Sequence, residues 1–537
     1  MTPYEEAAFV KAATKVVPRD ISLVLGQARL PADEFLFSRS KRLTYSGKSR
    51  GRGISMSNVK LRSGEVIPLE MHKARMVQKL NLLPVQQRRQ SIREAGFNAF
   101  MLKSRDVFMD MLTDSGTNAM SDNQFAAMFQ ADESYAGSET FFRLEKVLND
   151  MFGMKHFLPA HQGRACEHII SRTFVTPGSV AITNYHFTTT KAHITLMGGS
   201  LEELLIDEGL RVDSDEPFKG DMDTGKLEEA IGRIGTDNIS FVRIEASANL
   251  IGGQPVSVRN MREVSRICRA KQIPLVMDAS LLADNLYFNK IREAEFSGAD
   301  IADITREIGS LMDIIYFSAR KLGSSRGGGI LTSDDGAFKK MRDFVPLFEG
   351  FLTYGGMSTR DMEATAVGLT ETLDMDVISQ TPVFVEALCK EVQSKGVPVV
   401  TPFGGLGCHI NARQFCEHVP QEQYPAGALA AALFIAGGIR GMERGTISEQ
   451  RNPDGTERLA KLELVRLAVP KRVFTLSQMK FVADRAAWLF ENRRLIGGLK
   501  FTDEPKMLRF FIGKLDAIGD WPERLEKKFM EDFGTSL

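Results

Sequence analysis

Cysteine is scarce in this chain of 537 residues, and neither sign of charge predominates. The five cysteines are scattered and form no C-x-x-C pair, which argues against a disulfide framework or a zinc cluster and favours a reducing compartment. Lysine plus arginine number 68 and aspartate plus glutamate also number 68, so net charge gives no reason to expect a nucleic-acid or membrane partner.

Long hydrophobic segments are absent as well. The longest apolar run, residues 426–439, is too short and too rich in Ala and Gly to span a bilayer, so we expect a buried helix there. The N-terminus, MTPYEEAAFVKAATKVV, has two early glutamates and no apolar core, which predicts no signal peptide and a cytoplasmic location. A chain of this length exceeds a single core, so two or more domains are expected.

Basic residues are concentrated in one place. Residues 38–52, SRSKRLTYSGKSRGR, hold six Lys/Arg and no acid. We interpret residues 1–64 as an N-terminal extension whose basic part is a solvated arm or an oligomer contact. A nucleic-acid arm is the alternative, but Tyr45 is the only aromatic side chain in this run, which is too few for a stacking platform.

From about residue 65, short apolar segments alternate with amphipathic ones. Buried strands are predicted at residues 179–184, 239–246, 273–279 and 313–319, with helices such as 261–272 between them. This order is typical of an α/β fold with a mainly parallel sheet. After about residue 375 the pattern indicates a smaller α+β domain. The predicted domains are 65–119 (N-terminal part of the small domain and a linking arm), 120–375 (large) and 376–537 (small, C-terminal).

Polar residues stand where the predicted strands end, which is where sites form in such sheets. Asp278 ends one strand, and Ser318 and Lys321 end another, just before a glycine run that we interpret as a turn. Residues 162–164, Gln-Gly-Arg, precede a predicted helix whose first N–H groups suit a phosphate. A lysine for an imine, a carboxylate for a pyridine nitrogen and a phosphate cradle together match pyridoxal phosphate, with Phe187 as the ring that covers it.

The segment from Ser318 to Lys321 also permits other interpretations. It spells S-x-x-K, the nucleophile pattern of penicillin-recognising serine enzymes, which also need S-D-N and K-T-G. Residues 121–123 spell S-D-N, but they precede S-x-x-K instead of following it, and K-T-G does not occur. The remaining alternative is a strand that runs into a surface turn without any catalytic role.

Many segments resemble one known family in the same order. These segments are LTDSGTNAMSD (112–122), YAGSETFF (135–142), HQGR (161–164), FTTT (187–190), NLIGGQPVS (249–257), TYGGMSTRDMEA (353–364), RGMERG (440–445), LELVRLAVPKR (462–472) and GLKFTDEPKMLRFF (498–511). Over about residues 65–513 the chain resembles the β-eliminating lyases, the family of tyrosine phenol-lyase and tryptophanase. The resemblance implies a fold-type I pyridoxal-phosphate enzyme that assembles as a homotetramer and acts on an aromatic amino acid.

The resemblance also implies roles for individual residues. Lys321 is the Schiff-base lysine and the base for the α-proton, and Tyr135 protonates the leaving group. The implied cofactor contacts are Asp278 at the pyridine nitrogen, Phe187 on the ring, Asn249 at the phenolic oxygen, and Gln162, Gly163, Arg164 and Ser318 at the phosphate. The implied contacts to the substrate carboxylate are Arg466, Thr113 and Ser115.

Three positions suggest which leaving group is cleaved. Arg444, with Thr188, matches the phenol-lyase branch, where this pair recognises a phenolic hydroxyl, and the pair Phe510 and Phe511 matches the same branch. The implied reaction converts L-tyrosine or a substituted tyrosine to a phenol, pyruvate and ammonia. Tryptophanase activity, another amino-acid substrate and a non-catalytic binder remain the alternatives.

The chain departs from the family near the cofactor. Leu281 replaces an arginine that contacts the phenolic oxygen of the cofactor, and Arg320 replaces a lysine. The family also binds a potassium-type cation, for which Gly116 and Glu133 are the matching ligands, but Arg326 replaces its asparagine. We hypothesise that the guanidinium of Arg326 pairs with Glu133 and substitutes for the metal ion.

Overall fold

A seven-stranded sheet forms the core of the middle of the chain. The computed structural model describes residues 58–452 and 454–535, so the predicted basic arm at residues 38–52 lies outside the described residues. The strand order is β4 (His156–Ala160), β10 (Gly328–Thr332), β9 (Ile314–Ser318), β8 (Leu275–Asp278), β7 (Ile239–Glu245), β5 (Val180–Thr183) and β6 (Ser200–Glu203). Strands β9 to β6 pair in parallel, whereas β10 is antiparallel to both of its neighbours. The predicted mainly parallel sheet is confirmed.

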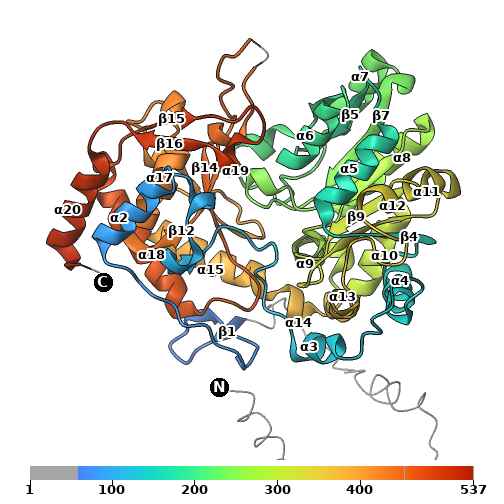
Figure 1. Ribbon diagram of the computed structural model, residues 1–537, viewed down its shortest axis with the longest axis horizontal. Coiled ribbons are helices and arrows are strands. Elements are labelled where there is room, and N and C mark those ends of the chain that lie inside the picture. Colours follow the sequence, from blue (N-terminus) through green and yellow to red (C-terminus); the bar gives the residue numbers. More distant parts are fainter. Residues whose placement is uncertain (1–57, 453, 536–537) are drawn as a thin grey trace, which may run out of the picture. The chain divides into compact units, whose positions relative to one another are not determined.

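Helices pack on both faces of this sheet (Figure 1). Successive strand residues point to opposite faces, and in β9 Ile315 and Phe317 join one hydrophobic core while Ile314 and Tyr316 join the other. The helices around the sheet are α3 (Asp122–Met128), α4 (Glu139–Phe152), α5 (Gly163–Phe174), α6 (Thr188–Leu196), α7 (Thr224–Ile234), α8 (Val258–Lys271), α9 (Leu282–Arg292), α10 (Ile301–Leu311), α11 (Asp335–Arg342), α12 (Val345–Phe348), α13 (Thr359–Glu371) and α14 (Met375–Ile378).

A second, smaller sheet lies in the C-terminal part of the chain. It is antiparallel, in the order β11 (Gly407–Asn411), β14 (Leu464–Ala468) and β13 (Met442–Arg444). Its helices are α15 (Gln380–Ser394), α16 (Ala412–Phe415), α17 (Pro425–Gly437), α18 (Leu476–Glu491), α19 (Arg509–Ile512) and α20 (Trp521–Phe533), with a hairpin of β15 (Leu499–Asp503) and β16 (Lys514–Ala517). Helix α17 is buried on all sides, as its apolar sequence predicted. No helix within the described residues is long and apolar enough to cross a bilayer.

Residues before the large sheet pack with the C-terminal part. Strand β3 (Met109–Asp110) pairs in parallel with β12 (Ile439–Arg440), and α2 (Val85–Glu94) shares a hydrophobic core with α17. The short hairpin of β1 (Asn58–Lys60) and β2 (Val66–Pro68) begins the described chain. The assignment of residues 65–119 to the small domain and the domain boundaries at 119 and 375 stay predictions.

The glycine run after Lys321 differs from its predicted role as a turn. Gly327 alone has a left-handed φ, of 101°, whereas Gly328 and Gly329 begin the buried strand β10. A Cβ atom on Gly328 would lie 2.5 Å from the carbonyl oxygen of Phe317, and one on Gly329 would lie 2.2 Å from the ring of Phe157. Glycine is required there by close packing within the sheet, and not by a turn.

Candidate active site

A cavity of about 370 Å³ lies where the parallel strands end. Asp278 is the last residue of β8, Ser318 is the last residue of β9, and Lys321 lies three residues after Ser318. The carboxyl ends of parallel strands meet at one edge of a sheet, which brings these side chains together. The predicted site residues that line the cavity are Thr113, Ser115, Gln162, Gly163, Arg164, Phe187, Asn249, Asp278, Ser318, Lys321, Arg444, Arg466 and Phe511.

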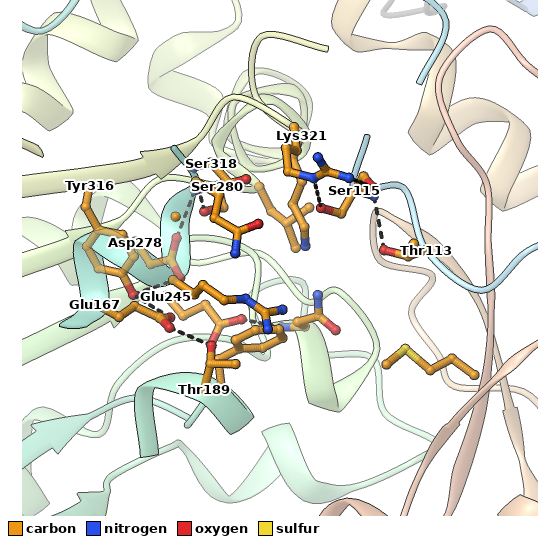
Figure 2. A pocket seen from close by; sticks show the side chains of 18 of the residues that line it. Thr113, Ser115, Glu167, Thr189, Glu245, Asp278, Ser280, Tyr316, Ser318 and Lys321 are labelled. Atoms are coloured by element: carbon orange, nitrogen blue, oxygen red, sulfur yellow. Dashed lines mark hydrogen bonds between the residues drawn. The ribbon is translucent and has the colours of Figure 1, made fainter. Parts of the chain in front are cut away.

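Asp278 is held by a buried hydrogen-bond network (Figure 2). Its Oδ2 accepts from Arg243 Nη2 at 2.8 Å and from the Tyr316 hydroxyl at 3.0 Å, and its Oδ1 accepts from the N–H of Ser280 at 3.0 Å. Glu167 accepts from the hydroxyl of Thr189 in the same network, and burial and the nearby Asp278 raise the pKa of Glu167. The carboxylate of Asp278 therefore has a fixed orientation toward the cavity.

Lys321 is held between an aromatic ring and a carboxylate. Its Nζ lies 5.8 Å from the centroid of the Phe187 ring and 3.6 Å from Asp114 Oδ1. The Lys321 side chain is 14% exposed, so it is largely shielded from solvent yet open to the cavity. A primary amine in this setting can attack a carbonyl carbon and can accept a proton.

The N-terminus of α5 forms a cradle for an anion. Helix α5 begins at Gly163, after Gln162, and a Cβ atom on Gly163 would lie 3.0 Å from the Cβ of Ser318. The close approach keeps the first N–H groups of the helix beside the Ser318 side chain, where they can donate to a phosphate. Ser280 accepts the Ser318 N–H through its Oγ at 3.1 Å, and the guanidinium of Arg320 lines the same cavity.

Two arginines enter the cavity from the small sheet. Arg466 on β14 donates from Nη1 to Asn249 Oδ1 at 2.7 Å and from Nη2 to the carbonyl of Leu112 at 2.8 Å, while its Nε has no acceptor. Arg444 on β13 is buried, and its Nε and Nη1 have no acceptor. Burial lowers the pKa of Arg466 to about 10, and burial together with Arg466 lowers the pKa of Arg444 well below its usual range. Two buried guanidinium groups here are short of negative partners.

The chemical groups that line this cavity fit pyridoxal phosphate. Lys321 supplies the amine for the aldehyde, and Asp278 supplies an oriented carboxylate for the pyridine nitrogen. The cradle of Gly163 and Ser318 suits the phosphate, and the Phe187 ring beside Lys321 suits the flat face of the cofactor.

Several predicted site residues do not line the cavity. Tyr135 is 72% exposed and packs its ring against Phe351 and Tyr354. Thr188 is buried at the start of α6, next to Phe187, and Phe510 is buried behind Phe511. The predicted metal ligands Gly116 and Glu133 also lie outside the cavity lining.

The hypothesis that Arg326 pairs with Glu133 is wrong within the described chain. Glu133 forms an ion pair with Arg360, and Arg326 Nη1 donates to the carbonyl of Ser325 at 3.0 Å. Arg360 lies on α13, far from Glu133 in the sequence, and the fold brings the two side chains together.

Several residues of the site were missed from the sequence, among them Glu167, Arg243, Glu245, Ser280 and Tyr316. A signal existed for two of them, since Arg243 and Glu245 interrupt the otherwise apolar strand β7 with charges two residues apart. Charges at this spacing lie on the same face of a strand, and a buried strand keeps them only when they are paired. For Glu167, Ser280 and Tyr316 we find no comparable signal.

The sheet and the lysine, aspartate and phosphate cradle at its strand ends define a fold-type I pyridoxal-phosphate enzyme. Solved structures agree in fold. A serine palmitoyltransferase from S. paucimobilis with bound pyridoxal phosphate is 12% identical, with a TM-score of 0.51 over 73% of this chain and 89% of that chain. A threonine aldolase from Leishmania major is 13% identical, with a TM-score of 0.50 over 71% of this chain and 99% of that one.

Sequence comparison identifies the family. The family model described as beta-eliminating lyase matches residues 110–485. A tyrosine phenol-lyase from Symbiobacterium sp. (strain SC-1) is 42% identical over 84% of this chain and 98% of its own length. Tyrosine phenol-lyases from Pasteurella multocida and Nostoc punctiforme are 41% and 39% identical over 84% and 83% of this chain, and over 98% and 96% of their own lengths. The chain belongs to the β-eliminating lyase family, and the predictions of the family, the fold class and a pyridoxal-phosphate-dependent lyase are confirmed.

Proposed function

We propose that this enzyme cleaves L-tyrosine, or a tyrosine with a substituted ring, with water to a phenol, pyruvate and ammonia. The observation that carries the proposal is the pair of buried arginines that line the cavity, Arg444 and Arg466, whose guanidinium groups include buried N–H donors without acceptors. A tyrosine-like substrate offers two matching groups, a carboxylate at one end and an acidic hydroxyl at the other. The names of the relatives support the same substrate.

Arg466 is the better placed of the two for the carboxylate. Its Nη1 and Nη2 are held by Asn249 and by the carbonyl of Leu112, which fixes the plane of the guanidinium. A fixed guanidinium can bind a carboxylate with charge-assisted hydrogen bonds. Thr113 and Ser115 line the cavity and are the predicted helpers in this contact.

Arg444 is left to bind the phenolic oxygen. Its guanidinium lies 5.8 Å from the centroid of the Phe187 ring, the side chain beside Lys321. Negative charge that gathers on the phenolic oxygen would be stabilised by a buried cation more strongly than in water. Indole has no hydroxyl at the matching place, so an unpaired Arg444 disfavours a tryptophanase.

The remaining steps are proton transfers. Bound pyridoxal phosphate supplies an electron sink for the negative charge left at the α-carbon of the substrate. Lys321 accepts the α-proton at Nζ, and Asp278 keeps a negative charge beside the pyridine nitrogen. Gln162, Gly163, Arg164 and Ser318 hold the phosphate, while Phe187 fixes the plane of the ring.

The acid for the leaving ring would come from a second copy of the chain. Tyr135 is the predicted acid, but it is exposed and outside the cavity of its own chain. Phe351 stacks on its ring and is also exposed, and Phe129 nearby in sequence is 90% exposed. We propose that these aromatic side chains contact another subunit of a homotetramer, where Tyr135 reaches the partner's cavity. We also propose a cytoplasmic location, because the five cysteines are free, which is typical of a reducing compartment.

A monovalent cation is not needed in the proposed mechanism. A Cβ atom on Gly116 would lie 2.5 Å from Arg320 Nη2, so the guanidinium of Arg320 sits directly against Gly116. Burial, Arg326 and Arg164 lower the pKa of Arg320, which indicates that these cations are close to one another. A potassium ion at the Gly116 carbonyl would be repelled by them.

The proposal is tested by assaying the purified, pyridoxal-phosphate-loaded enzyme with L-tyrosine, 3-substituted tyrosines and L-tryptophan. We expect phenol and pyruvate in equal amounts from L-tyrosine, or the matching phenol from a substituted tyrosine. Indole release from tryptophan in place of phenol would identify the tryptophanase alternative. Tight cofactor binding without any product would support a non-catalytic binder.

A further inference from the structure

A small cavity lies next to Lys321, beside the active-site cavity. Its volume is about 20 Å³, which is enough for one water molecule. It shares Ser280, Leu281 and Lys321 with the larger active-site cavity. The small cavity also touches three charged side chains for which the proposed function assigns no role: Asp114, Asp284 and Lys471.

Lys471 is a buried cation. It is 4% exposed, and its ammonium forms no ion pair within 4.0 Å in the part of the chain that the structure describes. Burial lowers the pKa of Lys471 to about 8, and Asp284 and Asp114 oppose that change. Arg472 and Glu371 beside it pair with each other at 3.7 Å, so they add no net charge. Lys471 is therefore the positive counterpart of the two buried aspartates.

Asp114 faces Lys321 with a free oxygen. Its Oδ1 is buried without a hydrogen-bond partner and lies 3.6 Å from Lys321 Nζ. The other aspartate, Asp284, accepts the N–H of Leu406 at 2.8 Å, and burial raises its pKa to about 6, which leaves it ionised at neutral pH. The side chain of Asn118 connects the backbones at the two lysines. Its Oδ1 accepts the backbone N–H of Lys471 at 2.8 Å, and its Nδ2 donates to the backbone carbonyl of Lys321 at 3.4 Å.

Among the four side chains Asp114, Asp284, Lys321 and Lys471, the charges balance when Lys321 carries a proton. Arg444 and Arg466 also interact electrostatically with Asp114, from the other side of the site. Two carboxylates and the Lys471 ammonium leave one net negative charge next to a neutral Lys321 amine. Uptake of the α-proton by Lys321 converts the cluster to two carboxylates and two ammonium groups. An opposite charge near a group favours its charged form, so the cluster favours the protonated base.

We propose that Asp114 and Lys471 are positioning residues that stabilise Lys321 after it has taken the α-proton of the substrate. The step moves one proton from the α-carbon to Lys321 Nζ, and no further reactant is needed. Asp114 acts through its contact with Lys321. The positive charge of Lys471 keeps Asp114 and Asp284 ionised, and because it offsets only one of the two negative charges, one remains to stabilise protonated Lys321. The proposal rests on the proposed role of Lys321 as the base.

Without Lys471, two buried carboxylates would face one lysine. Either the carboxylates take up a proton and lose their charge, or Lys321 stays protonated before the substrate arrives. Both outcomes remove the neutral amine beside an ionised carboxylate that proton abstraction requires. An arginine at this position would preserve the charge.

The test measures exchange of the α-hydrogen of L-alanine with D₂O by proton NMR. L-Alanine has no leaving group, so exchange reports removal of the proton alone. The variants are Asp114→Asn, Lys471→Met and Lys471→Arg, with Lys219→Met as the matched control. Lys219 is a second fully buried lysine with a pKa lowered by burial to about 8, but it lies outside the active-site cavity and donates to the carbonyls of Arg211 and Thr401.

We expect Asp114→Asn and Lys471→Met to slow exchange by roughly tenfold or more, with cofactor content close to that of the parent protein. Lys471→Arg should keep exchange within about threefold of the parent, and Lys219→Met should lower thermal stability without slowing exchange. The inference is overturned if Asp114→Asn exchanges as fast as the parent, if Lys471→Arg is as slow as Lys471→Met, or if Lys219→Met slows exchange equally. Absence of exchange in the parent protein would instead refute the role of Lys321 as the base.

Discussion

The two sides of the active-site cavity are built on opposite principles. On the side of the large sheet, Asp278, Arg243, Tyr316 and Glu167 are buried and hydrogen-bonded to one another. On the side of the small sheet, Arg444 and Arg466 have buried nitrogens without an acceptor, and Nε2 of His409, whose Nδ1–H donates to the Gly407 carbonyl, lacks a donor. The buried polar groups named on the first side have hydrogen-bond partners without a ligand, whereas several on the second side do not.

The difference shows which side is preorganised and which side awaits a ligand. A buried polar group without a partner costs free energy, so a fold retains several of them only when something else compensates. Anionic groups of a substrate would place negative charge beside the guanidinium groups of Arg444 and Arg466, which line the cavity. The hydrogen-bonded side instead holds its carboxylate in one orientation for a cofactor that is always present during catalysis.

Substitution of Asp278 should give the largest effect on stability. In Asp278→Asn, the buried Arg243 loses its closest carboxylate, which lies 2.8 Å away. Breaking a buried ion pair by removing one partner costs about 3–5 kcal/mol. We expect the free energy of unfolding of the cofactor-free protein to fall by this amount in urea titrations.

Asp313→Asn is the matched control for that experiment. Asp313 precedes β9 at the opposite end of the sheet and accepts the backbone N–H of Leu275 at 2.8 Å. It takes part in no ion pair within residues 58–452 and 454–535. A loss of about 1 kcal/mol is expected there, and an equal loss in both variants would mean that the Arg243 pair contributes little.

Substitution of Arg444 should strongly lower activity and leave stability almost unchanged. Arg444→Met removes the proposed partner of the phenolic oxygen and should lower kcat/KM for L-tyrosine by about 100-fold, or roughly 2.7 kcal/mol. Since the guanidinium is buried without a full set of acceptors, the free energy of unfolding should stay the same or rise by about 1 kcal/mol. Exchange of the L-alanine α-hydrogen should continue, because alanine has no phenolic oxygen. A variant that loses both activities would place Arg444 in the proton-abstraction step instead.

The same contrast explains which parts of the site the sequence predicts. Asp278, Ser318 and Lys321 are predictable because they stand directly at the ends of apolar strands, where geometry alone brings them together. Arg466 and Arg444 were found only through resemblance to a family. Their approach to the cavity depends on how β13 and β14 pack against the large sheet, and no local pattern specifies such a contact.

The rest of the fold follows the same division. Strands β5, β8 and β9 are mostly apolar runs, β7 is apolar apart from Arg243 and Glu245, and all four were predicted close to their observed bounds. The role of the glycine run was predicted wrongly, because a glycine needed for close packing inside a sheet has the same sequence appearance as a glycine in a turn. The pairing of Glu133 was also wrong, since its partner Arg360 comes from a distant helix.

His409, which lies opposite Arg466 in the small sheet, should make the stability of the protein depend on pH. Burial and the nearby Arg466 lower the pKa of His409 to about 3 in the folded protein. The unfolded chain binds this proton near pH 6.5, so between about pH 6.5 and 3 the unfolded state holds more protons and stability falls as the pH falls. His409→Gln removes this contribution and should reduce the loss of unfolding free energy between pH 6.5 and 5.5 by about 1 kcal/mol. Parallel stability curves for the parent and the variant would contradict the assignment.

Exchange of potassium for sodium should give the smallest effect. Arg320 already places a guanidinium against Gly116, and Arg326 adds a second cation near it, so we expect both to repel a cation at the predicted metal position. We expect phenol release to change by less than about twofold when potassium is replaced by sodium at constant ionic strength. Arg326→Asn removes one of the two cations and restores the side chain of the family, so this variant should gain activity from potassium relative to sodium. A parent enzyme that loses most of its activity without potassium would show that the ion binds despite both arginines, and Arg326 would then need another role.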